Sequence, residues 1–317
     1  MYVIIQIPCF NEEQTLPAVL ESLPKSLPGV NRLEVLIIND GSKDKTADVA
    51  RELGVQHVVS FPCNRGLASA FSAGIEKGLS LGADIIVNTD ADHQYPSHYI
   101  PQLIQPILDK QADIVIADRQ TETIKHFSPL KRFLQKLGSK VVSFACGSPV
   151  PDAPSGFRAY SREAASRLHV YNRYTYTIET LVQASHQGLH IHWIPIEVNP
   201  TDRPSRLVRS MPAYIFKAVQ VLIRTWATYK PIAFFTTLAA LCFIPSMAIC
   251  LRFLYFFIQG NGNGHIQSLI LSSILLSASF ALLLAGIISD QISRNRFLLE
   301  SIRIQLNRKA AEKREDS

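Results

Sequence analysis

Several familiar signatures are missing from the 317-residue sequence. The five cysteines show no CxxC spacing, and two of them lie inside apolar runs, so neither a zinc site nor a disulfide framework is indicated. Neither GxGxxG nor GxxxxGK[ST] occurs, which removes the fingerprints of the Rossmann dinucleotide site and the P-loop. The opening MYVIIQIPCFNEE lacks a basic segment and has too short an apolar core for a signal peptide. We therefore expect the polar part of the chain to stay in the cytoplasm.

Charge is almost absent from residues 232–289, although 18% of all residues are charged. Two uncharged runs, 232–251 and 266–289, are each long enough to cross a hydrocarbon layer of roughly 30 Å as a helix. A turn of Gly and Asn, FIQGNGNGH, separates them. The alternative, two buried helices of a soluble domain, is disfavoured because uncharged runs of this length are rare in soluble cores. The sequence predicts a transmembrane hairpin at 231–290, with spans at about 232–254 and 266–289.

The net charge of +6 comes from basic residues that flank the apolar region on its outer sides. By the positive-inside rule, this distribution places the N-terminal domain, both termini and a basic tail at 291–317 in the cytoplasm. It fits an anionic membrane face better than a duplex, and no motif of interleaved aromatic and basic residues indicates nucleic-acid binding.

Residues 206–230 show an apolar face with helical spacing directly before the first span. An interfacial helix lying on the bilayer would place Trp226 and Tyr229 at headgroup depth. A surface helix that packs on a soluble core is the alternative. The apolar face consists of Met211, Ile215, Ala218, Val219, Leu222, Ile223 and Trp226.

Residues 1–205 alternate short apolar runs with helical patterns and with Gly, Pro, Asn and Asp, which is typical of a soluble α/β domain. Helices are predicted at 15–23, 44–53 and 67–81. The alternation predicts a mostly parallel, Rossmann-like sheet with helices on both faces. Strands are predicted at 3–7, 34–38, 56–61, 84–87, 112–116 and 191–198.

Carboxylates follow three of these predicted strands, as Glu12, as Asp40, and as Asp90 with Asp92. A single Asp in such a place is usually a turn former or a helix cap. Because ligands gather at the carboxyl ends of parallel strands, several acids at this edge indicate a site. Hard oxygen ligands suit Mg²⁺ or Mn²⁺, and such an ion completes its shell with water and substrate phosphate. The pattern therefore predicts a phosphorylated ligand.

Five short motifs carry a resemblance to a known family. IPCFNEE, INDGSKDKT, NRGLASAFSAG and DADHQY occur in the order and approximate spacing of family-two glycosyltransferases with the glycosyltransferase-A fold, which the chain resembles. DAPSGFRAY at 152–160 looks like the acceptor-side motif of the polyprenyl-phosphate branch, and the C-terminal hairpin looks like its membrane-anchored members, the relatives of dolichol-phosphate mannose synthase. The resemblance covers essentially the whole chain.

The resemblance implies which residues hold the donor and the metal. Glu12 would contact the ribose and Asp40 the base. Asp90, Asp92 and Gln94 would hold Mg²⁺ or Mn²⁺, with Asp92 essential to catalysis. His93, which would point away from them in an extended backbone, is interpreted as structural. The nucleotide-sugar site as a whole would comprise Pro8, Phe10, Glu12, Asp40, Asp90 and Ala91.

The resemblance also implies which residues contact the acceptor. Arg119 matches an Arg that the family uses near the phosphates, and a surface Arg is its alternative. Asp152 is a candidate to orient the acceptor or to act as a base. The loop DRPSRLVRS also supplies Arg209, and a solvated basic membrane face is an alternative for its arginines. The acceptor phosphate would contact Lys131, Arg132, Arg203 and Arg206.

The function predicted from the resemblance is inverting transfer of a sugar from a nucleotide-sugar to undecaprenyl or dolichyl phosphate. NDGSKDKT favours a UDP-sugar over GDP-mannose, and a homo-oligomer is possible. A processive polysaccharide synthase is disfavoured because QVLIRTW departs from Q-x-x-R-W and because two spans cannot easily line a polymer channel. A transferase with a neutral glycolipid acceptor and a non-catalytic nucleotide-sugar-binding scaffold remain as alternatives.

Overall fold

The structure, a computed structural model, describes residues 1–120, 138–140, 142–144, 146–170, 176–199, 219–220, 223–224, 226–260 and 266–315. The chain forms two compact units, Met1–Ala218 and Val219–Ser317, which are described separately.

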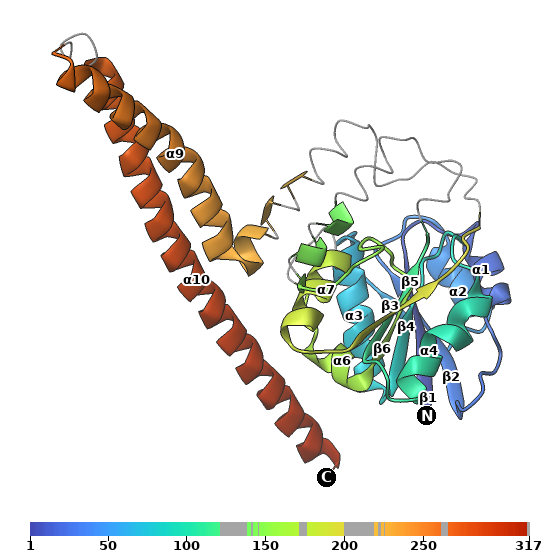
Figure 1. Ribbon diagram of the computed structural model, residues 1–317. Helices are drawn as coiled ribbons and strands as arrows, with labels where there is room; N and C mark the ends of the chain where they lie inside the picture. Colours follow the sequence, from blue (N-terminus) through green and yellow to red (C-terminus); the bar gives the residue numbers. More distant parts are fainter. Residues whose placement is uncertain are drawn as a thin grey trace. The chain divides into compact units, whose positions relative to one another are not determined.

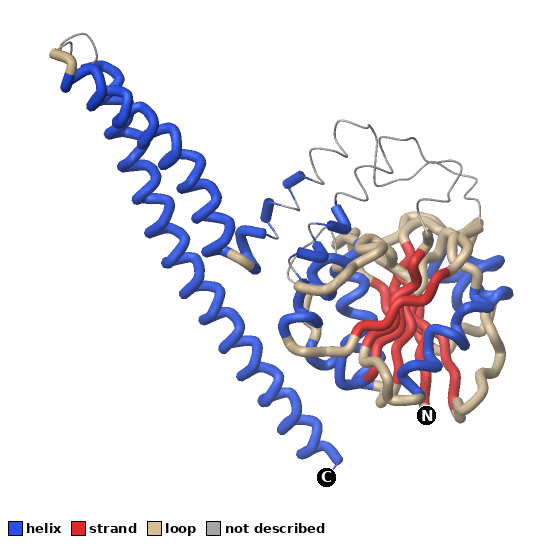
Figure 2. The backbone as a smooth tube through the Cα atoms, viewed as in Figure 1, coloured by secondary structure: helices blue, strands red, loops and turns tan. Residues whose placement is uncertain are grey.

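The first unit is built on a seven-stranded sheet in the order β3-β2-β1-β4-β6-β5-β7. The strands pair in parallel except β6, which runs antiparallel to both of its neighbours. Figure 2 shows these strands as a single twisted layer. The strands are β1 (Tyr2–Cys9), β2 (Arg32–Asn39), β3 (His57–Ser60), β4 (Ile85–Asn88), β5 (Ile114–Asp118), β6 (Arg158–Ser161) and β7 (Ile191–Pro195).

Helices cover both faces of this sheet, so the unit has three layers (Figure 1). One face carries α1 (Leu16–Ser22), α2 (Thr46–Glu52) and α4 (Ile100–Leu108), the last preceded by the short helix η1 (Ser97–Tyr99). The other face carries α3 (Leu67–Ser80), α6 (Arg162–Arg167) and α7 (Thr177–His186).

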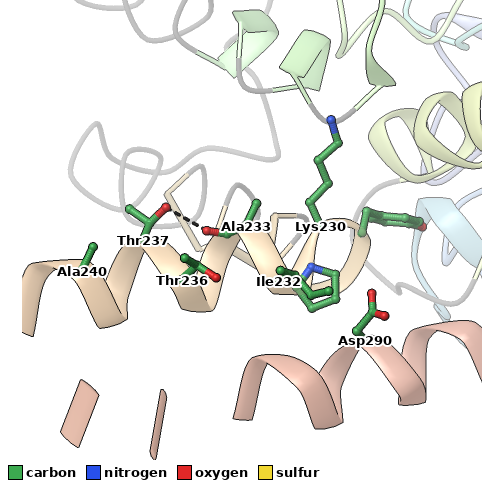
Figure 3. Close-up of a pocket in the computed structure, with 9 residues that line it drawn as sticks. Lys230, Ile232, Ala233, Thr236, Thr237, Ala240 and Asp290 are labelled. Atoms are coloured by element: carbon green, nitrogen blue, oxygen red, sulfur yellow. Dashed lines mark hydrogen bonds between the residues drawn. The ribbon is translucent and has the colours of Figure 1, made fainter. Parts of the chain in front are cut away.

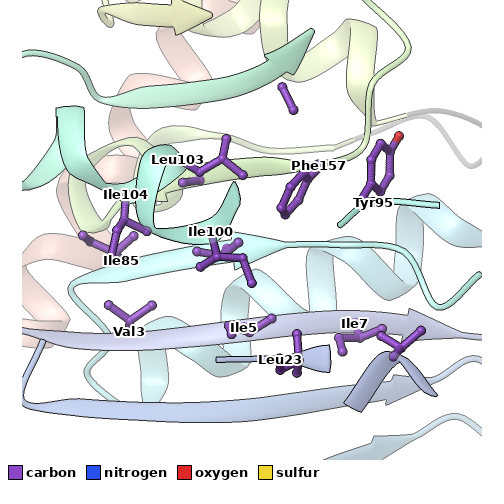
Figure 4. Close-up of a cluster of buried hydrophobic side chains, with 14 of the residues drawn as sticks. Val3, Ile5, Ile7, Leu23, Ile85, Tyr95, Ile100, Leu103, Ile104 and Phe157 are labelled. Atoms are coloured by element: carbon purple, nitrogen blue, oxygen red, sulfur yellow. The ribbon is translucent and has the colours of Figure 1, made fainter. Parts of the chain in front are cut away.

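Strand β1 lies inside the sheet, between β2 and β4, and is buried on both faces, which explains its apolar run, interrupted only by Gln6. Val3, Ile5 and Ile7 point to the face of α1 and α4, where they join Ile100 and Leu103 in the main apolar cluster (Figure 4). Each such side chain contributes about 1.5–3 kcal/mol when fully buried. This core fixes the sheet edge from which the site loops emerge.

The predicted mostly parallel α/β sheet with helices on both faces is confirmed, and each predicted strand and helix of this unit has a counterpart. Strand β6 and helices α4, α6 and α7 were not predicted. The boundary predicted at residue 205 falls outside the described residues.

The second unit contains a hairpin of two long apolar helices, α9 (Pro231–Ile258) and α10 (Ile266–Glu315). Stretches of both, Pro231–Ile258 and Ile266–Asn295, are long and apolar enough to cross a membrane, as predicted. The basic tail forms the continuation of α10 rather than a separate element. Of the predicted interfacial helix, residues 219–220, 223–224 and 226–229 are helical, and the remainder lies outside the described residues.

Small polar side chains connect the two helices of the hairpin. Ser246 Oγ donates to the carbonyl of Ser272 at 2.7 Å, and Ser272 Oγ donates back to the carbonyl of Ser246 at 2.8 Å. Ser279 Oγ donates to the carbonyl of Ala239 at 3.0 Å. Contacts of this kind satisfy hydroxyl groups that lipid could not.

A groove of about 780 Å³ lies at the start of α9, facing α10 (Figure 3). Its polar lining includes Lys230, Thr236 and Thr237 from the α9 side and Asp290 from α10. Thr237 Oγ1 donates to the carbonyl of Ala233, and Asp290 accepts from Arg294 Nε, both at 2.8 Å. These partners account for Thr237 and Asp290 as parts of the helices themselves.

Candidate functional site

The carboxyl ends of β1, β2 and β4 meet at one edge of the sheet. Cys9 pairs with Asn39, and Gln6 pairs with Asn88, in parallel register. The segments after these strands therefore leave the sheet side by side. They contain the carboxylates that the sequence predicted at a common edge.

The loops after β1 and β2 bind each other through reciprocal hydrogen bonds. The Glu12 amide donates to Thr46 Oγ1 at 2.8 Å, and the Lys45 amide donates to Glu13 Oε2 at 3.0 Å. Glu12 is 8% exposed, and its carboxylate accepts from Thr15 Oγ1 at 2.6 Å. These contacts fix the first two loops as one rigid wall.

Asp40, the residue directly after β2, is buried and holds a third loop. Its two carboxylate oxygens accept from the amides of Arg65 at 2.7 Å and Gly66 at 2.9 Å. The backbone of Cys63 packs so closely on Gly41 that a Cβ there would lie 2.3 Å from the Cys63 carbonyl carbon. The predicted base-binding carboxylate therefore also positions the loop that enters α3.

Asp90 and Asp92 follow β4 and are both half-buried. Burial and repulsion from Asp92 raise the pKa of Asp90 to about 7. Asp92 Oδ1 accepts from the amide of Gln94 at 3.1 Å, which closes a small turn around His93. His93 has a φ of 58°, so the extended backbone expected at this residue is wrong. The closed turn requires a left-handed residue instead.

Gly156, in the loop before β6, lies against Asp90. A Cβ at Gly156 would lie 3.2 and 3.3 Å from the two carboxylate oxygens of Asp90, and 2.9 Å from Tyr176 Oη. Asn88 Nδ2 donates to the carbonyl of Gly156 at 2.7 Å and to Tyr176 Oη at 3.0 Å. The Gly156 amide donates to Tyr95 Oη at 3.2 Å. These contacts surround one side of the Asp90 carboxylate with fixed groups.

Arg119, directly after β5, forms a buried ion pair with Asp152. Its Nε and Nη2 donate to the two oxygens of Asp152 at 2.7 and 2.8 Å, and its amide also donates to Asp152 Oδ2 at 3.1 Å. The two side chains are 10% and 1% exposed. Bidentate pairing of this kind fixes the plane of the guanidinium.

Arg158 is fully buried at the start of β6, and its described partners are neutral oxygens. It donates to the carbonyls of Ala153 at 2.9 Å, Ser155 at 2.8 Å and Thr177 at 2.9 Å. The charge therefore connects the loop before β6 to the start of α7. Arg158 belongs to the motif DAPSGFRAY, but the sequence predicted no role for this residue.

Comparison with known proteins assigns the family. Residues 4–169, more than half of the chain, match the family model described as glycosyl transferase family 2. The chain belongs to glycosyl transferase family 2. The resemblance to family-two glycosyltransferases and the predicted class of enzyme, a glycosyltransferase, are thereby confirmed.

Two relatives carry informative names. The UDP-N-acetylglucosamine--dolichyl-phosphate N-acetylglucosaminyltransferase of Methanococcus voltae is 30% identical over 218 residues, which cover 62% of this chain and 85% of that protein. The polyprenol monophosphomannose synthase of Mycolicibacterium smegmatis is 27% identical over 204 residues, covering 61% and 76%.

The fold of this family 2 member is also found in a solved structure. Glucosyl-3-phosphoglycerate synthase from Mycobacterium tuberculosis, crystallised with Mn²⁺, UDP and glucosyl-3-phosphoglycerate, gives a TM-score of 0.54 at 20% identity. The match covers 72% of this chain and 79% of that one. At this identity the likeness establishes the fold.

The predicted site residues of this transferase fall into three groups. Those at and after the ends of β1, β2 and β4 lie at one sheet edge, with Pro8 and Ala91 buried and Phe10 36% exposed. Arg119 and Asp152 are joined to each other. Lys131, Arg132, Arg203 and Arg206 lie outside the described residues. The residues that sequence reasoning missed are Asn88, Tyr95, Gly156, Arg158 and Tyr176.

Proposed function

We propose that this family 2 glycosyltransferase moves a sugar from a nucleotide-sugar to a polyprenyl phosphate with inversion at the anomeric carbon. The observation that carries the proposal is the Asp90 and Asp92 pair at the carboxyl edge of the sheet, with Gly156 against Asp90. The names of two relatives, which contain dolichyl phosphate and polyprenol, support the acceptor class. One of these names contains UDP-N-acetylglucosamine, which supports a UDP-sugar as donor.

The donor site is proposed to include Mg²⁺ or Mn²⁺ held by Asp90, Asp92 and Gln94. Among the described residues no three His, Cys, Asp or Glu side chains form a metal cage, so phosphate and water must complete the shell. The raised pKa of Asp90 fits this role, because burial and repulsion from Asp92 outweigh the attraction of Arg119 and Arg158. A bound ion supplies neutralisation of the charge on the departing nucleoside diphosphate.

The acceptor needs little help from a base, because a phosphate monoester has a second pKa of about 6 and is mostly ionised near neutrality. Both oxygens of Asp152 accept hydrogen bonds from Arg119. We therefore assign Asp152 the role of orienting Arg119, in place of the predicted general base. The Arg119 guanidinium lowers the pKa of Asp90, and this supports a role for Arg119 at the proposed phosphate site.

The membrane location remains part of the proposal. The hairpin would anchor the enzyme, and the basic residues flanking it would place both termini and the catalytic unit on the cytoplasmic side. Lys131, Arg132, Arg203 and Arg206 remain the predicted contacts of the acceptor phosphate.

Transfer assays on the full-length protein in detergent test the proposal. Labelled UDP-N-acetylglucosamine, UDP-glucose and GDP-mannose are each incubated with undecaprenyl phosphate or a diacylglycerol, with EDTA and then with added Mn²⁺ or Mg²⁺. We expect a lipid-phosphate sugar from a UDP-sugar, loss of product with EDTA, and recovery with the metal. Asp92→Asn should lower turnover by about a hundredfold or more, since this removes several kcal/mol of charge stabilisation.

Asp48→Asn is the matched control, because Asp48 is an exposed acid of the same unit that forms an ion pair with the exposed Arg51 on the same helix. It should retain wild-type turnover, and both variants should keep the wild-type melting temperature. Product on diacylglycerol alone would favour the neutral-acceptor alternative. Donor binding without turnover on any acceptor would favour the scaffold.

A further inference from the structure

A residue far along the chain binds the turn that contains Asp92. Asn199, in the segment after β7, donates from Nδ2 to the carbonyl of His93 at 3.0 Å and from its own amide to the carbonyl of Gln94 at 2.9 Å. The side-chain contact spans 106 residues of sequence. Two successive carbonyls of the turn are thus held by one residue.

The turn is in a conformation that needs such support. His93 has a φ of 58°, and a left-handed conformation costs a non-glycine residue roughly 1–2 kcal/mol. Inside the turn, Asp92 Oδ1 accepts from the amide of Gln94 at 3.1 Å. The orientation of the Asp92 carboxylate is therefore tied to the backbone at residues 93 and 94, which is the backbone that Asn199 binds.

The segment that carries Asn199 is itself firmly attached to the sheet. The amide of Ile196 donates to the carbonyl of Asp118, the last residue of β5, at 2.8 Å, and Ile196 is 2% exposed in the main core. The amide of Glu197 donates to Tyr99 Oη at 3.3 Å. Asn199 therefore extends from a rigid base to the turn.

We infer that Asn199 is a positioning residue for the proposed divalent-ion site. By holding the left-handed turn at His93, it keeps Asp92 in the orientation in which it shares an ion with Asp90. This inference rests on the proposed function only in that the Asp90 and Asp92 pair binds the ion with a nucleoside diphosphate. The chemistry of Asn199 itself is limited to two neutral hydrogen bonds, so its effect is on geometry and not on charge.

The test measures ion binding directly, without turnover. Full-length protein in detergent with saturating UDP is titrated with Mn²⁺, and free Mn²⁺ is followed by electron paramagnetic resonance. Asn199→Ala should weaken Mn²⁺ binding about tenfold, the lower end of the effect of groups that orient metal ligands. Asn199→Leu, which keeps the side-chain volume but cannot donate, should do the same and guards against a cavity effect in the alanine variant.

A second substitution separates positioning from general stability. In a His93→Gly background, Asn199→Ala should weaken Mn²⁺ binding by only about two- to threefold, because glycine adopts the left-handed turn without the penalty. Gln183→Ala is the matched control, since Gln183 also holds backbone groups, the amide and carbonyl of His169, outside the Asp92 turn. It should lower the melting temperature and leave Mn²⁺ affinity unchanged.

Each outcome decides the matter. Wild-type Mn²⁺ affinity in both Asn199 variants would overturn the inference while leaving the proposed function intact. Equal losses of affinity with and without His93→Gly would also overturn it, since the turn would then not transmit the effect. Absence of Mn²⁺ binding in the wild-type protein with UDP would overturn the proposed metal site and this inference together.

Discussion

Replacing Gly156 with alanine should damage both the stability of the catalytic unit and its activity, because the added methyl group has no space. The new Cβ would lie 2.9 Å from Tyr176 Oη and 3.2 Å from the nearer carboxylate oxygen of Asp90. Neither neighbour can move easily. The Tyr176 ring stacks on Phe71 at 4.0 Å with an interplanar angle of 8°, and its hydroxyl accepts from Asn88 Nδ2 at 3.0 Å.

The magnitude follows from this crowding. Overpacking a rigid site costs about 1–3 kcal/mol, and with two close contacts we expect about 2 kcal/mol here. For a unit of this size, 1 kcal/mol corresponds to roughly 2–4 °C in melting temperature, so Gly156→Ala should melt roughly 4–8 °C lower. Because the methyl group also pushes Asp90, the rate of sugar transfer should fall by about tenfold or more.

Thermal melting and transfer assays on the full-length protein in detergent would measure both effects. Gly138→Ala is the matched control, because a Cβ there meets nothing within 4 Å, and it should leave both quantities unchanged. Tyr176→Phe removes the nearest oxygen, so the double variant should be less destabilised than the sum of the single variants by about 1 kcal/mol. The transfer activity of the double variant should stay low, since the contact between the new methyl group and Asp90 remains. Additive losses of stability in the double variant would refute the clash with Tyr176. A wild-type melting temperature for Gly156→Ala would refute the predicted crowding altogether.

Two further predictions concern buried and partly buried charge. Arg158→Met should lower the free energy of unfolding of the catalytic unit, measured in urea, by about 3 kcal/mol, because three buried carbonyls lose their donor. Arg162→Met is the control, because it loses one hydrogen bond, to the carbonyl of Ala83, and should cost about 1 kcal/mol. Equal losses in the two variants would contradict the role of Arg158 as a donor to buried carbonyls. Burial alone would raise the pKa of Glu34, but hydrogen bonds from Tyr2, His57 and Arg32 lower it to about 2. Its stabilising effect is thus fully present above its unfolded pKa of about 4.5 and is lost as the pH falls toward 2. Glu34→Gln should lower the free energy of unfolding, measured in urea, by about 2 kcal/mol at pH 6 and by about 1 kcal/mol at pH 3. A loss that does not change with pH would contradict the lowered pKa of Glu34.

Local pattern was enough to predict the strands that build the sheet edge. β1, β2 and β4 are apolar runs followed at once by polar turn residues, and their parallel pairing makes those turns neighbours. The continuity of α10 through residue 315 follows from a different local property, the lack of Gly and Pro after Gly286.

The residues that support the site could not be predicted in this way, because their hydrogen-bond partners lie far away in the sequence. Arg158 looks like a surface residue in a four-residue strand, yet it is buried because carbonyls from two other segments accept its N–H groups. His93 was expected in extended backbone, but it is left-handed, and Asn199 donates hydrogen bonds to the carbonyls of His93 and Gln94. No window of neighbouring residues contains this information.

The antiparallel strand β6 explains why these distant segments meet at the carboxyl edge of β1, β2 and β4. In a wholly parallel sheet, the loop that leads into a strand lies at the amino edge, away from the site. Asn88 pairs with Arg158 in antiparallel register, so the residue two positions after Asn88 faces the residue two positions before Arg158. Those residues are Asp90 and Gly156. Ile116 of β5 pairs with Arg158 as well, and the same rule brings the end of β5, with Arg119, to the loop that carries Asp152. Reversing one strand therefore gives the proposed metal site a second wall, with Gly156 against Asp90 and Asp152 bound to Arg119.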